Sequence, residues 1–364
     1  KRYKKTARWF KTNMNILHLD LGPEIRGGQR QVHYILNYFS HIPDINSCLG
    51  CLEGSPLRHS KADSSGPLLF PSRQEFDPRN WIRLRSFLRQ NKIDIIHTHE
   101  PRAASLAALF KAASLFSGSL IHTRRVSYPL RNAWSRKKYS LADALVCVSQ
   151  EVRGVMLGLD FPDSRIWTIP SAIDVKKYSV AAEGKSDCLR LGIIGALTPQ
   201  KGHEFLLDAL AYLTDIDFYL YVVGEGRLFA HLISRTRELG LENRVEFCGY
   251  VQSQKIIPQL DVVVVPSMDG EGSNAVIKEA WACRVPVFVS DLASNVELVR
   301  HEKDGLVFSR HEPESLAQMI RSAHEDYAVP AALAENGYAR VGDFDVPKMG
   351  RAHLDMYNTL TSEK

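Results

Sequence analysis

The sequence predicts an α/β protein of two domains, each with a parallel β-sheet covered by helices on both faces. Short apolar runs rich in β-branched residues alternate with segments of helical periodicity along nearly the whole chain. The run Asp261-Val-Val-Val-Val-Pro266 has the length and composition of a strand that is buried on both faces. At 364 residues the chain is too long for a typical single domain, and it fits two domains of about 170 residues.

The expected strands and helices form two alternating series. In the first series we expect strands at residues 15–20, 94–97, 120–123 and 144–148, with helices at residues 27–39 and 103–113. In the second series we expect strands at residues 189–194, 218–223, 245–247, 262–265 and 285–289. A last helix starts at Pro347 and has apolar residues at Met349, Leu354, Met356, Tyr357 and Leu360. Such βα alternation predicts parallel sheets whose ligands bind at the carboxyl ends of the strands.

The most informative segment is Glu271-Gly-Ser-Asn-Ala-Val-Ile-Lys-Glu279, which follows the buried strand and a Gly-rich turn. A strand, turn and helix in this order leave the backbone N–H groups of Ser273 to Val276 free to bind an anion. A carboxylate would repel a phosphate, so we expect Glu271 and Glu279 to accept hydrogen bonds from sugar hydroxyls. Their spacing alone is equally typical of two solvated surface glutamates, and the surrounding sequence must decide between the two interpretations.

Further motifs accompany this segment in a fixed order. They are Gly27-Gly28, His97-Thr-His-Glu-Pro101, Gly195-Ala-Leu-Thr-Pro-Gln-Lys-Gly202, Val222-Val-Gly-Glu-Gly226, Val265-Pro-Ser267, Glu279-Ala-Trp-Ala-Cys283, Val285-Pro-Val287, Glu297-Leu-Val and Asp304-Gly-Leu-Val307. Together they resemble the retaining glycosyltransferases of family 4, which have the GT-B fold. The resemblance spans nearly the whole chain from Met14, and the order of the motifs is more specific than any one of them.

The resemblance implies two Rossmann-like domains that face each other across a cleft. It divides the chain into a basic extension (residues 1–13), an N-terminal acceptor domain (14–174), a linker (175–188), a C-terminal nucleotide-sugar domain (189–345) and a helix that returns to the first domain (346–364). The basic extension matches nothing in the family.

The resemblance also implies roles for individual residues. Glu279 would hold the ribose hydroxyls, Glu271 the donor sugar and Lys201 the diphosphate, whose developing charge the ammonium group would stabilise. His99 would contact the donor sugar, and Gly27 and Gly28 would bring backbone N–H groups close to the donor. The implied catalytic residues are His99, Lys201 and Glu271, and the implied donor-binding set is Gly27, Gly28, Gly195, Lys201, Glu271, Gly272, Ser273, Asn274, Ala275, Val276 and Glu279. By themselves, a Gly pair is also typical of a tight turn and a single His of a structural residue.

Two positions depart from the family pattern. Ala196 stands where the family commonly has Arg, and a cation about 4 Å from a phosphate is worth roughly 4 kcal/mol at an effective dielectric constant of 20. Either Arg124 or Arg125 compensates, or the charge on the leaving group is stabilised by Lys201 and helix amides. Arg284 stands where the family usually has Gly, which concerns the geometry of the loop more than the chemistry.

Charge is unevenly distributed along the chain. Residues 1–180 hold 28 Lys and Arg against 14 Asp and Glu, whereas the rest hold 18 against 27. A basic first half favours an anionic partner, such as membrane lipid or a lipid-linked phosphate. The densest group, in which Tyr128 and Trp134 are interleaved, supplies the candidates for an acceptor-binding or anionic surface: Arg124, Arg125, Arg131, Arg136, Lys137 and Lys138. A solvated helix face is the alternative interpretation.

We expect no metal and no other cofactor. Cys48-Leu-Gly-Cys51 lacks the second pair of a zinc site, so we interpret the six cysteines as buried side chains in a reducing cytoplasm. Asp215-Ile-Asp217 precedes an apolar strand instead of following one, and we interpret it as a surface turn. No apolar run reaches the roughly 20 residues of a membrane span, and no secretory signal is evident.

The function that these observations favour is transfer of a hexose, with retention, from a nucleoside-diphosphate sugar to a cell-envelope acceptor. That acceptor would be lipopolysaccharide core, a lipid-linked glycan or a polysaccharide. The alternatives are a small-molecule glycosyltransferase and a GT-B sugar-nucleotide epimerase. We expect no nucleic-acid partner, since no recognition motif accompanies the basic residues, and no dehydrogenase, since no G-x-G-x-x-G follows the first strand. We expect a cytoplasmic protein, peripheral on the inner face of the membrane if the basic surface binds lipid.

Overall fold

A computed structural model describes residues 13–60, 66–130, 132–180 and 188–362. The chain divides into two compact units. The first contains Lys1–Val148, Val152–Pro170 and Val346–Lys364, and the second contains Ser149–Glu151 and Ser171–Asp345. The first boundary therefore falls at Pro170, four residues before the position chosen from the sequence. The basic extension lies outside the described residues except for Asn13.

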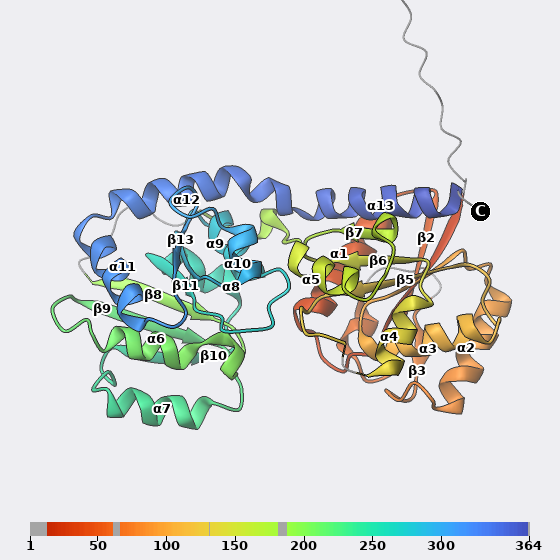
Figure 1. The fold of residues 1–364 in the computed structure, drawn as a ribbon, viewed down its shortest axis with the longest axis horizontal. Coiled ribbons are helices and arrows are strands. Elements are labelled where there is room, and N and C mark those ends of the chain that lie inside the picture. Colours follow the sequence, from red (N-terminus) through yellow and green to blue (C-terminus); the bar gives the residue numbers. More distant parts are fainter. Residues whose placement is uncertain (1–12, 61–65, 131, 181–187, 363–364) are drawn as a thin grey trace, which may run out of the picture. The chain divides into compact units, whose positions relative to one another are not determined.

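Figure 1 shows strands and helices in the first unit, and the sheet there has, within the described residues, seven parallel strands in the order β3-β2-β1-β4-β5-β6-β7. They are β1 (Met14–Asp20), β2 (Ile45–Leu52), β3 (Leu68–Phe70), β4 (Ile95–Thr98), β5 (Ser119–Arg124), β6 (Ala144–Cys147) and β7 (Ile166–Thr168). The chain moves outward from β1 to β3 and then returns to the other side of β1. This reversal between β1 and β4 is the feature that positions ligands in doubly wound sheets.

Helices cover both faces of this sheet. They are α1 (Gly27–Phe39), α2 (Pro78–Gln90), α3 (Pro101–Ala112), α4 (Ala133–Ser140), α5 (Gln150–Leu157) and α13 (Val346–Ser362). Because side chains alternate along a strand, Leu17 and Leu19 of β1 pack in one apolar cluster with α3. The intervening His18 lies on the opposite face, beside Phe39 of α1 and Tyr357 of α13.

In the second unit, the described residues form six parallel strands in the order β10-β9-β8-β11-β12-β13 (Figure 1). They are β8 (Leu189–Ile194), β9 (Phe218–Val223), β10 (Val245–Gly249), β11 (Val262–Val265), β12 (Val287–Ser290) and β13 (Leu306–Phe308). Val262 and Val264 contribute to one apolar cluster, and Val263 and Val265 to another. A strand that is buried on both faces must be apolar at every position, which explains the continuous valine run.

The helices of the second unit divide between these two clusters. One face is covered by α6 (His203–Leu210), α7 (Phe229–Glu238) and α11 (Pro313–Glu325). The other is covered by α8 (Ser253–Ile256), α9 (Ala275–Ala282), α10 (Ala293–Leu298) and α12 (Ala328–Val341). Short 3₁₀ turns complete the chain at η1 (Pro56–His59), η2 (Asp163–Arg165), η3 (Val175–Lys177), η4 (Pro199–Lys201), η5 (Ile257–Gln259) and η6 (Gly342–Phe344).

The last helix, α13, returns to the first unit, as the sequence predicts. It packs closely on α1, since a Cβ added at Gly350 would lie 2.3 Å from the ring of Tyr38. Tyr357 of the same helix shares a hydrogen bond of 2.6 Å with Nδ1 of His97 in β4. None of the helices in the described parts of the chain is long and apolar enough to cross a bilayer.

The interpretation of the six cysteines as buried side chains is confirmed for four of them. All six are free; four are buried and two are partly buried. Cys48 and Cys51 lie in β2, a strand that the sequence analysis did not predict. Burial raises the pKa of Cys51 to about 11, so its thiol stays protonated and behaves as a small apolar group. Asp215-Ile-Asp217 forms an exposed bend, in which Asp215 pairs with Arg321 at 2.9 Å.

The packing of α12 on α9 gives a first prediction. A Cβ added at Gly337 would lie 2.2 Å from Cδ1 of the fully buried Trp281, so we expect Gly337→Ala to lower the free energy of unfolding by about 1–3 kcal/mol. Gly342 has a helical φ of −59° and no heavy atom within 4 Å of an added Cβ, so Gly342→Ala should be neutral or slightly stabilising. Denaturant unfolding of both variants checks this, and equal stabilities would contradict the packing shown here.

Candidate functional site

Each sheet has one point at which the strand order reverses, between β1 and β4 in the first unit and between β8 and β11 in the second. At such a point the loops leave neighbouring strands in opposite directions and open a crevice at the carboxyl ends of the strands. Several of the motifs singled out in the sequence lie in these loops. Residues 195–202 follow β8, residues 266–274 follow β11, and His99 follows β4.

In the second unit, the loops after β8 and β11 are joined at several points. Nζ of Lys201 and Oε1 of Glu271 form an ion pair. Oε1 of Glu271 also accepts a hydrogen bond of 3.0 Å from the hydroxyl of Ser267. The backbone N–H of Met268 donates to the carbonyl oxygen of Gln200 at 2.8 Å. The two residues expected to bind the diphosphate and the donor sugar are therefore brought together and bonded to each other.

Glycines make this close approach possible. Gly202 has a φ of 68°, and a Cβ there would lie 1.9 Å from the carbonyl oxygen of Pro266. Gly224, at the end of β9, has a φ of 141°, and its Cβ would lie 1.9 Å from the carbonyl oxygen of Gly195. Only glycine fits at either position. The glycines of the separate sequence motifs thus pack against one another at one edge of the sheet, with the stem of Lys201 lying over Gly195.

Helix α9 begins at the end of this loop. Asn274 is its N-cap, and the Asn274 side chain accepts the backbone N–H of Val276 at 3.2 Å. The expectation that Val276 offers a free N–H group is therefore wrong, because the cap uses it. Glu271 is 8% exposed and Glu279, in the second turn of α9, is 2% exposed. This burial excludes the interpretation of the two glutamates as solvated surface residues.

The two departures from the family pattern differ in their consequences. Ala196 is exposed and supplies no charge beside the Lys201 loop. Arg284 adopts the left-handed conformation that a glycine would favour, with a φ of 56°. Its guanidinium lies 4.3 Å from the centre of the Tyr338 ring and pairs with Glu335 at 3.4 Å, both on α12. These contacts offset the roughly 1 kcal/mol cost of that backbone conformation, so the loop geometry is retained.

In the first unit, His99 belongs to a directional chain of hydrogen bonds. Nη2 of Arg125 lies 3.4 Å from Nδ1 of His99, Nε2 of His99 lies 3.0 Å from Nδ1 of His18, and Nε2 of His18 lies 3.1 Å from the hydroxyl of Ser47. Because a guanidinium can only donate, each histidine accepts at Nδ1 and donates at Nε2. The chain therefore sets the tautomers of both histidines and turns the lone pair of His99 toward Arg125.

His18, His97 and His99 have ring nitrogens within 4.8 Å of one another, close enough to suggest a metal site. His97, however, bonds to Tyr357 at 2.6 Å and to Thr123 at 2.7 Å. With the chain above, every nitrogen of the three rings has a hydrogen-bond partner. We therefore interpret the cluster as a hydrogen-bonded network. Burial lowers the pKa of His18 to about 3 and lowers the pKa values of His97 and His99 well below their ordinary value.

The diglycine motif lies at the start of α1, as expected, and its loop is shaped by Asp20, which the sequence analysis missed. The Asp20 carboxylate, fully buried at the end of β1, accepts the N–H of Gly22 at 2.8 Å and the amide of Gln29 at 3.0 Å. Burial raises the pKa of this carboxyl group. The sequence did contain a signal for Asp20, because it is a polar residue at the carboxyl end of an apolar strand. A Cβ at Gly28 would lie 3.4 Å from Cδ of Arg125.

Arg125 is thus placed beside the amino end of α1. Its Nε is shielded from solvent and has no hydrogen-bond partner among the described residues. Burial lowers the pKa of the guanidinium to about 10, and the carboxylate of Asp20 partly opposes that effect. The guanidinium nevertheless stays charged at neutral pH. Of the two arginines considered as substitutes for the missing cation at Ala196, Arg125 is the one next to the diglycine motif.

The expected cationic surface needs correction at two of its members. Arg124 is buried, donates to the carbonyl oxygen of Tyr128 and lies 5.7 Å from the centre of the Tyr139 ring. Lys138 is also buried, and its Nζ donates to the carbonyl oxygen of Pro101 at 2.9 Å. Both cations are used inside the unit because they sit at a strand end and on the inner face of a helix. Arg131 lies outside the described residues.

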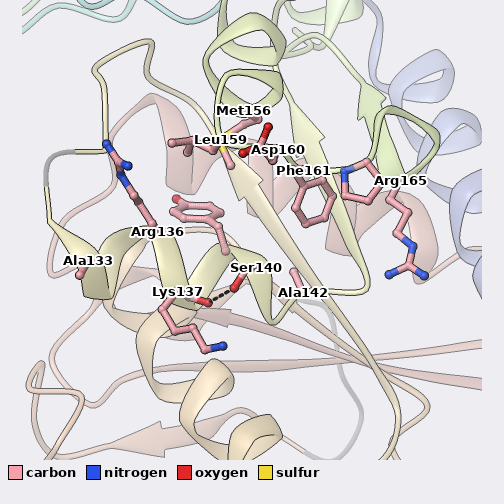
Figure 2. A pocket seen from close by; sticks show the side chains of 12 residues that line it. Ala133, Arg136, Lys137, Ser140, Ala142, Met156, Leu159, Asp160, Phe161 and Arg165 are labelled. Carbon is pink, nitrogen blue, oxygen red and sulfur yellow. Dashed lines mark hydrogen bonds between the residues drawn. The ribbon is translucent and has the colours of Figure 1, made fainter.

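Of the remaining members, Arg125 is half-buried beside α1, whereas Arg136 and Lys137 are exposed on α4 and line a pocket of about 550 Å³. Met156, Leu159 and Phe161 contribute apolar side chains to the same pocket, as Figure 2 shows. Arg136, Lys137 and the additional Arg165 lie on different sides of it (Figure 2). These cations therefore do not converge on one point, and the pocket lacks the geometry of a dedicated phosphate site.

Both halves of the chain match known protein families. Residues 27–177 match the family model described as Glycosyltransferase Family 4, and residues 189–326 match the one described as Glycosyl transferases group 1. The chain belongs to the family 4 glycosyltransferases.

Individual relatives cover three quarters or more of this glycosyltransferase. It is 25% identical to the UDP-Gal:alpha-D-GlcNAc-diphosphoundecaprenol alpha-1,3-galactosyltransferase of Escherichia coli, over 97% of this chain and 99% of that protein. It is 25% identical to the lipopolysaccharide core biosynthesis glycosyltransferase LpsE of Rhizobium meliloti, over 76% and 78% of the two chains. The structure of Anabaena HepE in complex with UDP and glucose matches with a TM-score of 0.82 at 20% identity, over 95% of this chain and 100% of that chain. The fold is GT-B, as predicted.

The buried histidines of this glycosyltransferase predict acid sensitivity. His18, His97, His99 and His353 have lowered pKa values because of burial, so the unfolded chain binds more protons below about pH 6.5. The contribution of these histidines to the free energy of unfolding is therefore complete above pH 6.5. It falls as the pH drops toward 4, by about 1.4 kcal/mol per pH unit for each histidine that must take up a proton. Urea unfolding between pH 7.5 and 4.5 checks this, with His353→Gln expected to give a shallower slope. A flat profile would contradict it.

Proposed function

We propose that this glycosyltransferase moves a hexose, with retention of anomeric configuration and without a metal ion, from a nucleoside-diphosphate sugar to an acceptor of the cell envelope. The observation that carries the proposal is the Lys201–Glu271 ion pair at the reversal point of the second sheet, with Glu279 buried in the helix that follows. The ammonium group can pair with a diphosphate, and the two carboxylates can accept hydrogen bonds from the hydroxyls of two sugar rings. All three groups lie near the carboxyl ends of two adjacent strands.

Donor binding then exchanges one ionic partner for another. The diphosphate takes the place of Glu271 as the partner of Lys201, and the freed carboxylate accepts hydrogen bonds from the hydroxyls of the donor sugar. Because Lys201 keeps an anionic partner throughout, its ammonium group is never left unpaired, which avoids the main cost of breaking a partly buried ion pair. Glu279 accepts the ribose hydroxyls, as the family resemblance implies.

The leaving diphosphate is stabilised without the arginine that Ala196 replaces. Lys201 supplies one full charge, and the amino end of α9 supplies the backbone N–H groups of Ser273, Asn274 and Ala275 together with the helix dipole. Fixed donors of this kind stabilise charge as it develops in the transition state, since they need no reorganisation.

The first unit contains an anion-binding element of its own. The backbone N–H groups of Gly27 and Gly28 open α1, and the guanidinium of Arg125 lies beside Gly28. His99 orients Arg125 through the lone pair on Nδ1. These groups match the role in binding donor phosphate and sugar that the family resemblance implies for the diglycine motif and the histidine.

The names of the relatives guide the choice of substrates. One relative uses UDP-Gal and a diphosphoundecaprenol-linked sugar, a second belongs to lipopolysaccharide core biosynthesis, and HepE was crystallised with UDP. We therefore propose a UDP-hexose donor and a lipid-linked or lipopolysaccharide-core acceptor. The acceptor would be reached by a cytoplasmic protein working at the inner face of the membrane, where the exposed cations of the first unit favour anionic lipid.

A thermal-shift screen of the full chain against UDP-, GDP-, ADP- and CMP-sugars, with and without EDTA, tests the donor and the absence of a metal. We expect stabilisation by a UDP-hexose that EDTA leaves unchanged, equivalent to about 2.7 kcal/mol at a hundredfold excess over Kd. Stabilisation that EDTA abolishes would contradict the metal-free proposal. No shift with any nucleotide sugar would contradict the donor site itself, and turnover of UDP-hexose without an acceptor would favour the epimerase alternative.

The role of Glu279 is tested by donor affinity. We expect Glu279→Ala to raise the donor Kd by about 10- to 100-fold, because the ribose hydroxyls lose a charged acceptor worth roughly 1.5–3 kcal/mol. Glu279→Gln keeps the volume of the buried side chain and should raise Kd by a smaller factor. Glu242→Ala, at an exposed position outside the site, is the matched control. Isothermal titration calorimetry measures the donor Kd of all three variants. Wild-type affinity in both Glu279 variants would contradict the assignment of Glu279 to the ribose hydroxyls.

A further inference from the structure

Lys278 is a buried charged residue for which the proposed mechanism has no use. It lies in α9, next to Glu279, and is 0% exposed. Burial lowers the pKa of its ammonium group to about 7, with Glu279 and Glu297 opposing the shift. Lysine is almost never fully buried in proteins unless it has specific partners.

The partners of Lys278 come from three separate parts of the second unit. Its Nζ donates to the hydroxyl of Ser273 at 2.6 Å and to the carbonyl oxygen of Ser171 at 2.6 Å. It also lies 4.9 Å from the centre of the Phe344 ring, within the range of a cation–π contact. Ser171 begins the main segment of this unit, and Phe344 lies next to its last residue, Asp345.

These two terminal segments are also bonded to each other. The backbone N–H of Ile173 donates to the carbonyl oxygen of Phe344 at 2.9 Å, and the N–H of Val175 donates to the side chain of Asp345 at 3.3 Å. They therefore form one ordered layer, and Lys278 attaches α9 to that layer. Through Ser273 the same ammonium group reaches the loop that contains Glu271.

Packing alone does not explain a lysine here. Desolvating an ammonium group costs several kcal/mol, and neutral acceptors recover only part of that cost. An apolar side chain of similar length would fill the same volume without the penalty. What only the ammonium group does is bond simultaneously to Ser273 and Ser171. Ser273 lies two residues after Glu271 and directly before the cap residue Asn274, so this bond restrains the segment that presents the donor-binding groups.

We propose that Lys278 is a positioning residue for the donor site, which holds the 271–274 loop against the Ser171 and Phe344 segments and so preorganises the amino end of α9 for the donor. The inference rests on the proposed function, because it assigns the donor to that helix end. Preorganisation of a binding loop improves affinity by reducing the ordering cost of binding. Lys278 touches neither the donor nor the reacting atoms in this scheme.

The first test needs no ligand. In Lys278→Met and in Ser273→Ala, we expect amide hydrogen exchange across residues 270–276 to become about 10-fold faster, since each variant removes a hydrogen bond to a charged group. Lys303→Met, which removes an exposed lysine from the same unit, should exchange at the wild-type rate. Unchanged exchange in both variants would overturn the inference whatever the donor proves to be. Ser273→Ala keeps the test decisive if Lys278→Met fails to fold.

The second test uses steady-state kinetics with the nucleotide sugar that the thermal-shift screen identifies. We expect both variants to raise the donor KM by about 10-fold while kcat stays within about 3-fold of wild type, which a general loss of folded protein would not produce. Faster exchange with an unchanged donor KM would overturn the donor-site role of Lys278. Failure of the wild-type chain to bind any nucleotide sugar would instead overturn the proposed function, and the role of Lys278 with it.

Discussion

The ion pair between Lys201 and Glu271 is the interaction on which the candidate donor site depends. It joins the loops that follow two neighbouring strands, β8 and β11, at the point where the order of the sheet reverses. The joined loops can come this close only because Gly202 lies against the carbonyl oxygen of Pro266. Motifs that are some 70 residues apart in the sequence thereby become one surface, on which the proposed phosphate-binding cation and the proposed sugar-binding carboxylate are paired with each other.

Both units bury polar side chains that form hydrogen-bonded networks with one another. In the first unit, Arg125 sets the direction of hydrogen bonds through His99 and His18 to Ser47. In the second, Lys278 bonds to Ser273 and Ser171. Such networks cost stability relative to an apolar core, but they hold one side-chain orientation. Both networks lie near the candidate binding loops, and most of the remaining core consists of aliphatic and aromatic side chains.

The departures from the family pattern are local and have local explanations. Arg284 has the left-handed backbone conformation that glycine adopts most easily, and its contacts with Tyr338 and Glu335 on α12 offset the cost of that conformation. Ala196 removes a charge without changing the backbone, since the neighbouring Gly195 and Leu197 keep their bonds to Val223 and Glu225 of the β9 end. The loss of charge at Ala196 therefore concerns the chemistry of the site and not its backbone geometry.

The sequence by itself determined the fold class, the order of the motifs and the strongest elements, such as β8, β9, β11, α1 and the returning α13, because valine and isoleucine runs and helical periodicity are local signals. It missed β2 and the short edge strands β3, β7 and β13, whose few residues carry no distinct pattern. Tertiary structure decided which partners the charged side chains find: Glu271 for Lys201, Gln29 for Asp20, and Ser273 and Ser171 for Lys278. It also turned Arg124 and Lys138 inward. Burial, and pairings such as Lys201 with Glu271 and Lys278 with Ser171, depend on residues distant in the chain, which local patterns do not show.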